Sequence, residues 1–274
     1  MKMNDLKIPG KFLSSFILTQ EFKRFEEFVN SCVDYRYIGV CYGEPGVGKS
    51  LAAAYYTKWR EELTSENLVS DISLENSSMA KICKGVFVTV PVTNTPKTIR
   101  YEIHRRYFGY GSSVAKANGI TDLEVRVKYA NSFCPLVILD ESDRLSFNSL
   151  EEVRNMYDYL HFGLVLIGMP GFEKRLSRYP QLFSRIGFAH QYKSLGEDEM
   201  RFVFPRIWSK MGKEYDPEYF ADYEAMNTII RITGGNFRLI DRIFSQICRI
   251  MEINKLQTVT KEVVEAARKC LLIG

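Results

Sequence analysis

The stretch GEPGVGKS, from Gly43 to Ser50, decides the fold of this 274-residue chain. It matches the pattern G-x-x-x-x-G-K-[ST], whose glycines let the backbone turn tightly with its N–H groups pointed at a phosphate. The preceding sequence, Tyr37 to Tyr42, is apolar and β-prone, and the following sequence, Ser50 to Leu63, has a helical pattern. A strand, a glycine-rich loop and a helix N-terminus in this order predict a nucleotide site. The alternative is a glycine-rich turn that binds nothing.

Each part of this loop has an expected task. The Lys49 ammonium reaches the β- and γ-phosphates, and the Ser50 hydroxyl coordinates Mg²⁺. The expected cofactors are therefore ATP and Mg²⁺. The predicted nucleotide-binding residues are Gly43, Glu44, Pro45, Gly46, Val47, Gly48, Lys49, Ser50 and Leu51.

A second signal lies in PLVILDESDRL, residues 135–145, where an apolar strand ends in two adjacent carboxylates. Ligands of parallel sheets bind at the carboxyl ends of the strands. Asp140 is expected to hold Mg²⁺, directly or through water, and Glu141 to polarise the attacking water as general base. The alternative is a strand that ends in a solvated acidic turn.

Composition describes an ordinary globular chain, with 46% apolar residues, 26% charged residues and a net charge of +4. No apolar run reaches the roughly 18 residues of a membrane span, and the N-terminus lacks the apolar region of a signal peptide. The six cysteines are scattered, with no C-x-x-C pair, which favours reduced thiols in a cytoplasm over disulfides or a zinc site. We expect a cytoplasmic protein without membrane contact and without a metal other than Mg²⁺.

The chain divides into three segments by pattern. Residues 1–35 form a short leader with a helix after Thr19. Residues 36–193 alternate strand and helix, with strands expected at 37–42, 85–92, 135–140, 163–168 and 188–192. This alternation predicts an α/β core with a parallel sheet flanked by helices. Residues 194–274 read as amphipathic helices, broken by TGGN at 233–236, and predict a small all-helical lid domain.

These features together resemble the AAA+ ATPases, and the resemblance assigns further residues. FSRIGF, residues 183–188, is similar to the segment that carries the arginine finger, so Arg185 is expected to reach the γ-phosphate of a neighbouring subunit. Arg178 is the second choice. GGNFR, residues 234–238, is similar to the sensor-2 turn, which assigns Arg238 to the phosphates of its own subunit. Met169 departs from the pattern, because sensor 1 usually offers a polar Asn or Thr there.

Chain size and two further stretches narrow the resemblance to ATP-binding regulators of DNA transposition, the TniB/TnsC type and the phage Mu B protein. The stretches are LVLIGMPGFEKRLSRYPQLFSRIGF and GGNFRLIDRI. The resemblance implies a homo-oligomer, a ring or a helical filament, that assembles on duplex DNA with ATP. It also implies a separate DDE-type transposase as partner, a target-selection adaptor as a further partner, and slow hydrolysis stimulated by assembly.

A basic cluster between residues 97 and 128 bears on DNA contact. Seven lysines and arginines stand there against three carboxylates, a net charge of +4. In the related transposition ATPases, segments flanking the corresponding helix follow the DNA backbone, and phosphate contact needs positive donors rather than base reading. The alternative is a solvated basic helix. The predicted DNA-binding residues are Lys97, Arg100, Arg105 and Lys116.

The sequence leaves two other functions open. One is a different DNA-acting AAA+ protein, such as a replicative helicase loader. The other is a protein-remodelling or secretion-associated ATPase that binds no DNA. Stimulation of hydrolysis by duplex DNA separates the last from the others.

Overall fold

The computed structural model of the chain describes residues 16–59, 80–120, 122, 124–125 and 134–271. They form two compact units. The sheet unit comprises Phe22–Gly43 and Lys49–Tyr192, and the helical unit comprises Glu44–Gly48, Lys193–Gly274 and the first residues up to Glu21. The expected domain limits, 1–35, 36–193 and 194–274, stay predictions.

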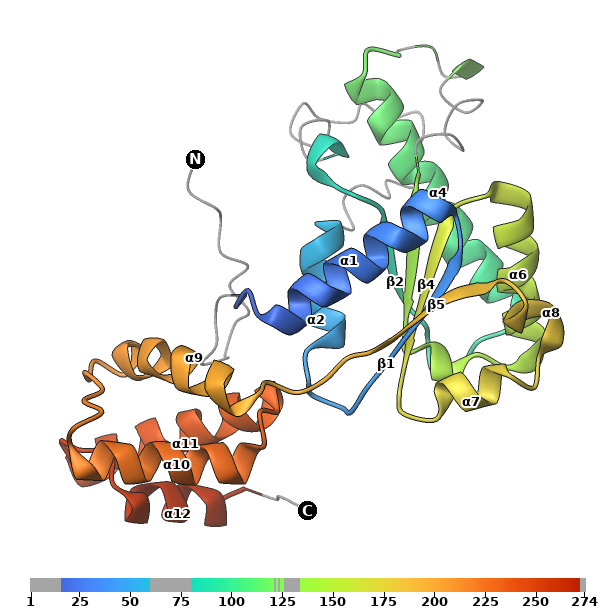
Figure 1. Cartoon of the computed structure of the whole chain (residues 1–274). Helices are drawn as coiled ribbons and strands as arrows, with labels where there is room; N and C mark the ends of the chain where they lie inside the picture. Colours follow the sequence, from blue (N-terminus) through green and yellow to red (C-terminus); the bar gives the residue numbers. More distant parts are fainter. Residues whose placement is uncertain (1–15, 60–79, 121, 123, 126–133, 272–274) are drawn as a thin grey trace. The chain divides into compact units, whose positions relative to one another are not determined.

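The sheet unit is built on five parallel strands in the order β2-β3-β4-β1-β5 (Figure 1). Every residue of β3 and β4 is buried, as a parallel sheet covered on both faces requires. This confirms the predicted α/β class. The strands are β1 (Ile38–Tyr42), β2 (Val86–Thr89), β3 (Leu136–Asp140), β4 (Gly163–Gly168) and β5 (Ile186–Gln191).

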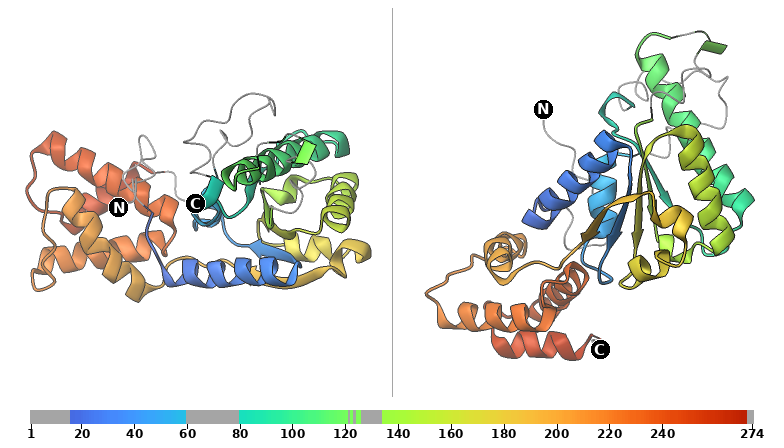
Figure 2. Two further views of the ribbon diagram at one scale, coloured as in Figure 1. Left: turned by 90° about the horizontal axis from the view of Figure 1, so that it is seen from above. Right: turned by 45° about the vertical axis from the view of Figure 1, so that its right-hand side comes forward.

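Helices cover the two faces of this sheet. Figures 1 and 2 show α1 (Gln20–Tyr35) and α2 (Lys49–Thr57) on one face, and α4 (Pro96–Ala117) and α6 (Phe147–Leu160) on the other. Right-handed crossovers explain why α2 lies opposite α4 and α6, because the chain steps outward from β1 to β2 and then returns through β3 to β4. The short helices α7 (Phe172–Leu176) and α8 (Pro180–Phe183) connect β4 to β5.

Local contacts explain where these elements lie. Helix α1 approaches β1 closely at Gly39, where a Cβ would meet the Cys32 sulfur at 2.3 Å. Helix α2 ends at Thr57, earlier than the expected Leu63, because Lys58 adopts a left-handed φ of 55°, typical of helix ends. The expected residues beyond 59 lie outside the described part of the chain. Strand β2 ends at Thr89 rather than residue 92, and β5 begins at Ile186 rather than residue 188.

The helical unit has its own core, which includes the fully buried Trp208, Phe204 and Phe244. Two left-handed glycines, Gly234 and Gly235, end α10 and allow the turn into α11 at the predicted TGGN. The helices of this unit are α9 (Glu197–Lys210), α10 (Phe220–Thr233), α11 (Phe237–Asn254) and α12 (Lys261–Lys269). Across the described residues of both units, no helix has the length and apolar character to cross a bilayer.

Candidate nucleotide site

The predicted phosphate-binding loop connects β1 to α2, and its glycines are required by its geometry. Gly46 and Gly48 have φ angles of +86° and +110°, a region that side chains disfavour. Gly43 is required for a different reason, because a Cβ there would lie 2.3 Å from the carbonyl oxygen of Tyr192. The loop therefore has the backbone conformation that the sequence pattern predicts.

The other loop residues differ in their burial. Val47 is buried and fixes the loop, whereas Glu44, Pro45 and Ser50 are exposed. Leu51, in the first turn of α2, is 38% exposed. Ser50 and Leu51 lie in the first turn of α2, where backbone N–H groups favour anions.

Lys49 and Asp140 are buried charges at the carboxyl edge of the sheet. The Lys49 ammonium donates to the Gly43 carbonyl oxygen at 2.6 Å. Burial lowers the pKa of Lys49, and nearby acidic groups, including Asp140 and Glu141, oppose this change. Burial raises the pKa of Asp140, while hydrogen bonds from the Ser50 side chain and the Glu141 N–H oppose it. The ammonium of Lys49 suits a phosphate, and the carboxylate of Asp140 suits a cation, so the pair fits a ligand that contains both.

The donors present fit Mg²⁺. The Ser50 hydroxyl and the Asp140 carboxylate are neighbours joined by a hydrogen bond, and both are the oxygen ligands that Mg²⁺ prefers. Mg²⁺ usually combines one or two such protein ligands with water and substrate phosphates. Within the described residues, no group of three or more His, Cys, Asp or Glu side chains forms a separate metal site. These two residues would hold Mg²⁺ together with nucleotide phosphates.

Glu141 follows the strand in a strained conformation. Its φ of 57° and ψ of 36° are left-handed, which is uncommon outside glycine and occurs often at functional sites. The residue begins a short 3₁₀ helix, η2 (Ser142–Arg144), and its half-buried carboxylate lies 3.6 Å from the Arg144 guanidinium. Sequence reasoning missed Arg144, although an acid and an arginine three residues apart at a helical turn commonly pair.

Arg185 lies where β5 begins, and its guanidinium is already engaged. It donates to both carboxylate oxygens of Asp158, at 2.7 and 2.9 Å, and to the Gln181 carbonyl oxygen. Arg154 donates to the same Asp158 at 2.9 Å. Arg178 is exposed, and its side chain has no hydrogen bond or ion pair with other described residues. The finger role of Arg185 stays a prediction, and it requires an exchange of partners.

Arg238 occupies the first turn of α11, in the unit that also contains loop residues 44–48. Its backbone N–H donates to the Gly46 carbonyl oxygen at 3.2 Å, and its side chain is exposed. The preceding Asn236 caps α11 and donates to the Pro45 carbonyl oxygen at 2.8 Å. Sequence reasoning missed Asn236, although Asn before a helix is a common N-cap.

The side chain at the expected sensor-1 position, directly after β4, is a methionine. The strand ends at Gly168, so Met169 occupies the position that sequence analysis expected, with 36% of its surface exposed. A thioether is a weak hydrogen-bond acceptor and has no N–H or O–H donor. This side chain cannot donate a hydrogen bond to a phosphate.

The four predicted DNA contacts do not form one patch. Lys97 is exposed in the first turn of α4, whereas Lys116 lies in its last turn, roughly 28 Å away along the axis. Arg100 is bound through Nε and Nη2 to the buried carboxylate of Glu152, at 2.5 and 2.8 Å. Arg105 lies about 140° around the helix from Arg100 and faces Glu102. Arg100 and Arg105 therefore do not share a face of α4, and the roles of all four residues in DNA binding stay predictions.

Two further residues of the basic cluster, Arg126 and Lys128, lie outside the described residues. The cluster as a sequence feature is thus divided between separate turns of α4 and positions beyond it. Of the described residues in this cluster, Lys97 lies nearest in the chain to the end of β2.

Comparison with known proteins agrees with this geometry. The AAA domain family model matches residues 33–176. A potential ATP-binding protein of Staphylococcus aureus is 40% identical over 272 residues, covering 95% of this chain and 97% of the relative.

Solved structures give the same fold at low identity. The Holliday junction branch migration motor RuvB of Thermotoga maritima has a TM-score of 0.58 at 15% identity, over 99% of this chain and 74% of that one. The ORC2 protein of Aeropyrum pernix has a TM-score of 0.56 at 15% identity, over 94% and 70% of the two chains. The parallel sheet and the helical region following it are thus those of an AAA+ P-loop protein.

Proposed function

The chain belongs to the AAA domain family, and from this premise we propose that it is an ATP-dependent, DNA-binding regulator of transposition. It is an ATPase, as the family and the ATP-binding relative establish. The proposal adds that it assembles as a homo-oligomer on duplex target DNA. It then recruits or activates a separate DDE-type transposase, which performs the strand transfer.

The ATPase part rests on the edge of the sheet. Lys49 would neutralise the β- and γ-phosphates, and Ser50 and Asp140 would hold Mg²⁺ that neutralises developing charge. Glu141 would accept the proton of the attacking water, since a carboxylate can serve as general base. Arg185 of a neighbouring subunit would stabilise the transition state once it leaves Asp158, with Arg178 as the second candidate.

One observation carries the DNA part of the proposal. The exposed first turn of α4, which contains Lys97, comes a few residues after β2, and the residue after β2 is hydrogen-bonded to Asp140. The Val90 N–H donates to the Asp140 carbonyl oxygen at 2.9 Å, and α4 begins six residues later. A contact with DNA phosphates at this turn would thus lie close in the chain to the hydrolytic residues. The similar RuvB structure is named as a branch migration motor for Holliday junctions, which are DNA.

The test combines hydrolysis with assembly. Phosphate release is measured with and without duplex DNA, and the same samples with ATP are imaged by electron microscopy. We expect faster turnover on DNA and ordered oligomers that need both ATP and DNA. Turnover indifferent to DNA, with no DNA-bound oligomer, would favour a protein-remodelling ATPase. A helicase loader would bind DNA but fail to stimulate a transposase encoded beside it.

A further inference from the structure

We propose that the turn before α10 and the start of that helix, residues 213–224, form a docking surface for a lysine- and arginine-rich segment of a partner protein. We call it the acidic aromatic surface. The proposal rests on the proposed function for the owner of that segment, the separate transposase, because proteins that bind DNA carry clusters of basic residues. All residues of the surface belong to the helical unit.

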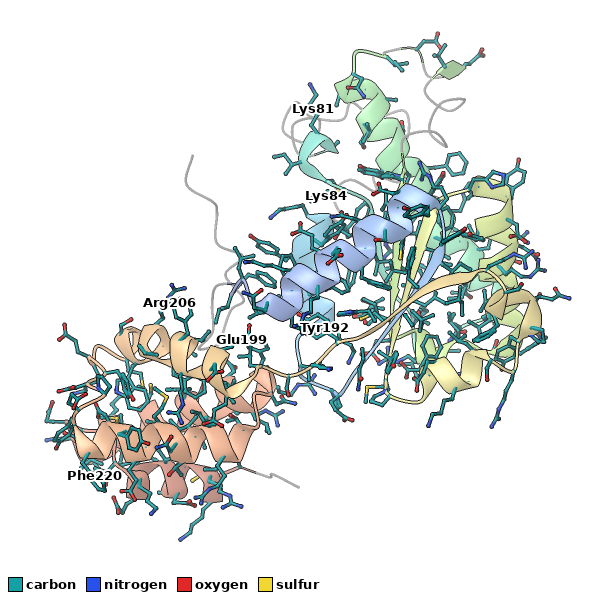
Figure 3. The ribbon with its side chains drawn as sticks, viewed as in Figure 1. Lys81, Lys84, Tyr192, Glu199, Arg206 and Phe220 are labelled. Atoms are coloured by element: carbon teal, nitrogen blue, oxygen red, sulfur yellow. The ribbon has the colours of Figure 1, made fainter. Side chains whose placement is uncertain are left out.

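Three large aromatic side chains of this surface are in contact with water. Phe220 is 74% exposed, Tyr219 and Tyr223 are exposed as well, and Figure 3 shows Phe220 at the surface of the helical unit. Tyr219 immediately precedes α10, and the other two lie in its first turn, so Tyr223 follows them at the spacing of helical neighbours. Exposed apolar side chains that gather in one place are typical of a surface that binds another molecule, and aromatic residues are enriched in protein interfaces.

The same surface is strongly acidic. Residues 213–224 contain five carboxylates and one lysine, a net charge of −4 in a chain whose net charge is +4. Glu224 is paired with Lys261 at 2.9 Å, whereas Glu214 and Glu218 are exposed and form no ion pair with other described residues. This negative charge repels DNA phosphates and attracts a cationic partner.

The turn that presents these side chains is fixed by carboxylates that accept backbone N–H groups. The buried Asp222 accepts from the Asp216 N–H at 3.1 Å, and the Asp216 carboxylate accepts from the Glu218 N–H at 2.9 Å. Tyr215 anchors the turn on the core of the unit, where its ring packs edge-on against Trp208 with 5.5 Å between the ring centroids. A partner would therefore bind a surface that folding has already ordered, which favours affinity.

The chemistry of the surface defines the partner. A lysine or arginine can pair with a carboxylate through its charged end and can lie over an aromatic ring with its cation and methylene groups. Phe202 on α9 already has such a cover, because the Arg206 guanidinium lies 4.6 Å from its ring centroid. No cation among the described residues covers Tyr219, Phe220 or Tyr223 in this way. A basic segment of a partner would supply it.

The experiment measures, by fluorescence anisotropy, binding of short overlapping peptides of the transposase encoded beside this chain, and of a synthetic peptide of lysine pairs and single leucines. We expect a lysine- and arginine-rich peptide to bind. Phe220→Ser should weaken its binding about 30-fold, the usual size for an aromatic anchor. Glu214→Gln combined with Glu218→Gln should weaken it about fivefold and reduce its salt dependence. Phe202→Ser, an exposed aromatic position that is already covered, is the matched control and should bind as the wild type does.

Equal binding of the basic peptides by the wild type and by Phe220→Ser overturns the proposal, and so does preferential binding of acidic or neutral peptides. If Phe220→Ser instead loses the oligomers formed with ATP and DNA, the surface is a contact between copies of this chain, and the proposal fails as well. Phosphate release with and without DNA tests the proposed function separately. If the wild type does not respond to DNA, the proposed function fails in its DNA part. The synthetic peptide, which requires no transposase, then decides whether the surface binds a cationic segment.

Discussion

Short stretches of sequence predict a site both at the phosphate-binding edge of the sheet and on helix α4. The predicted residues lie together at the edge but not along the helix. At the edge, Lys49, Ser50 and Asp140 lie together, although β3 follows β1 by almost a hundred residues. Along α4, the predicted contacts divide between ion pairs and opposite ends of the helix. The difference is one of how each site is specified.

The edge is specified by backbone chemistry. Its loop needs glycine at particular torsion angles, and parallel strands must end at the same edge, so sequence order implies spatial proximity. A basic helix carries no such constraint. Whether Arg100 is available depends on Glu152, which is 52 residues away on another helix. Sequence reasoning is therefore strong where backbone geometry fixes the position of a residue, and weak where a side chain on another element decides.

The largest expected effect concerns the base at the edge. Glu141→Gln should lower kcat by about 10²–10⁴-fold, because an amide cannot accept the proton of the attacking water. ATP affinity should change little. Single-turnover phosphate release, together with binding of a fluorescent ATP analogue, measures the two effects separately. Glu197→Gln, an exposed acid on α9, is the control, and equal kcat in the two variants would remove Glu141 from this role.

Nucleotide affinity is the next effect in size. Lys49→Ala removes a buried ammonium whose hydrogen bonds to charged phosphates are each worth about 1.5–3 kcal/mol. We expect ATP to bind about 10–100-fold more weakly by calorimetry. The exposed Lys23→Ala on α1 should bind ATP as the wild type does. Undiminished affinity in Lys49→Ala would mean that the loop is only a tight turn.

A variant of Arg185 tests whether an arginine that is paired with a carboxylate can still serve as an arginine finger. Arginine fingers contribute about 10³–10⁵-fold in well-studied NTPases, but the finger must first leave Asp158, so we expect a loss nearer tenfold. Arg185→Ala subunits should regain turnover when mixed with Lys49→Ala subunits, because each lacks a different half of a shared site. Absence of recovery at every ratio, with loss and recovery in Arg178→Ala instead, would transfer the role to Arg178.

Prediction from sequence recovered most of the fold, and the structure places the predicted residues Lys49, Ser50 and Asp140 together. The apolar runs located five strands to within about three residues, because buried parallel strands contain few polar side chains. The Arg144–Glu141 pair and the helix N-cap Asn236 have recognisable local signals that the motif patterns did not include. Asp158 and Glu152 have none, since an acid on a helix looks the same whether or not it faces a distant arginine.

The smallest effect separates two neighbours on α4, and it tests the comparison directly. If the first turn of α4 follows DNA phosphates, each lost contact should reduce the slope of log affinity against log salt by about 0.9. Lys97→Ala should show this full reduction, because Lys97 is exposed and has no ion pair with other described residues. Arg100→Ala should show less, because two of its nitrogens are bound to Glu152.

Glu152→Gln supplies the opposite change. This substitution weakens the ion pair with Arg100 and leaves the arginine unchanged. The slope of log affinity against log salt should therefore become steeper, by up to the amount expected for one additional phosphate contact. Binding isotherms of wild type and variants across a salt series, on two unrelated duplexes, measure all three slopes. Loss of affinity on one duplex alone would indicate base reading rather than phosphate contact. If Arg100→Ala instead matches Lys97→Ala, the ion pair with Glu152 does not withhold Arg100 from DNA, and the contrast between the two regions disappears at this residue.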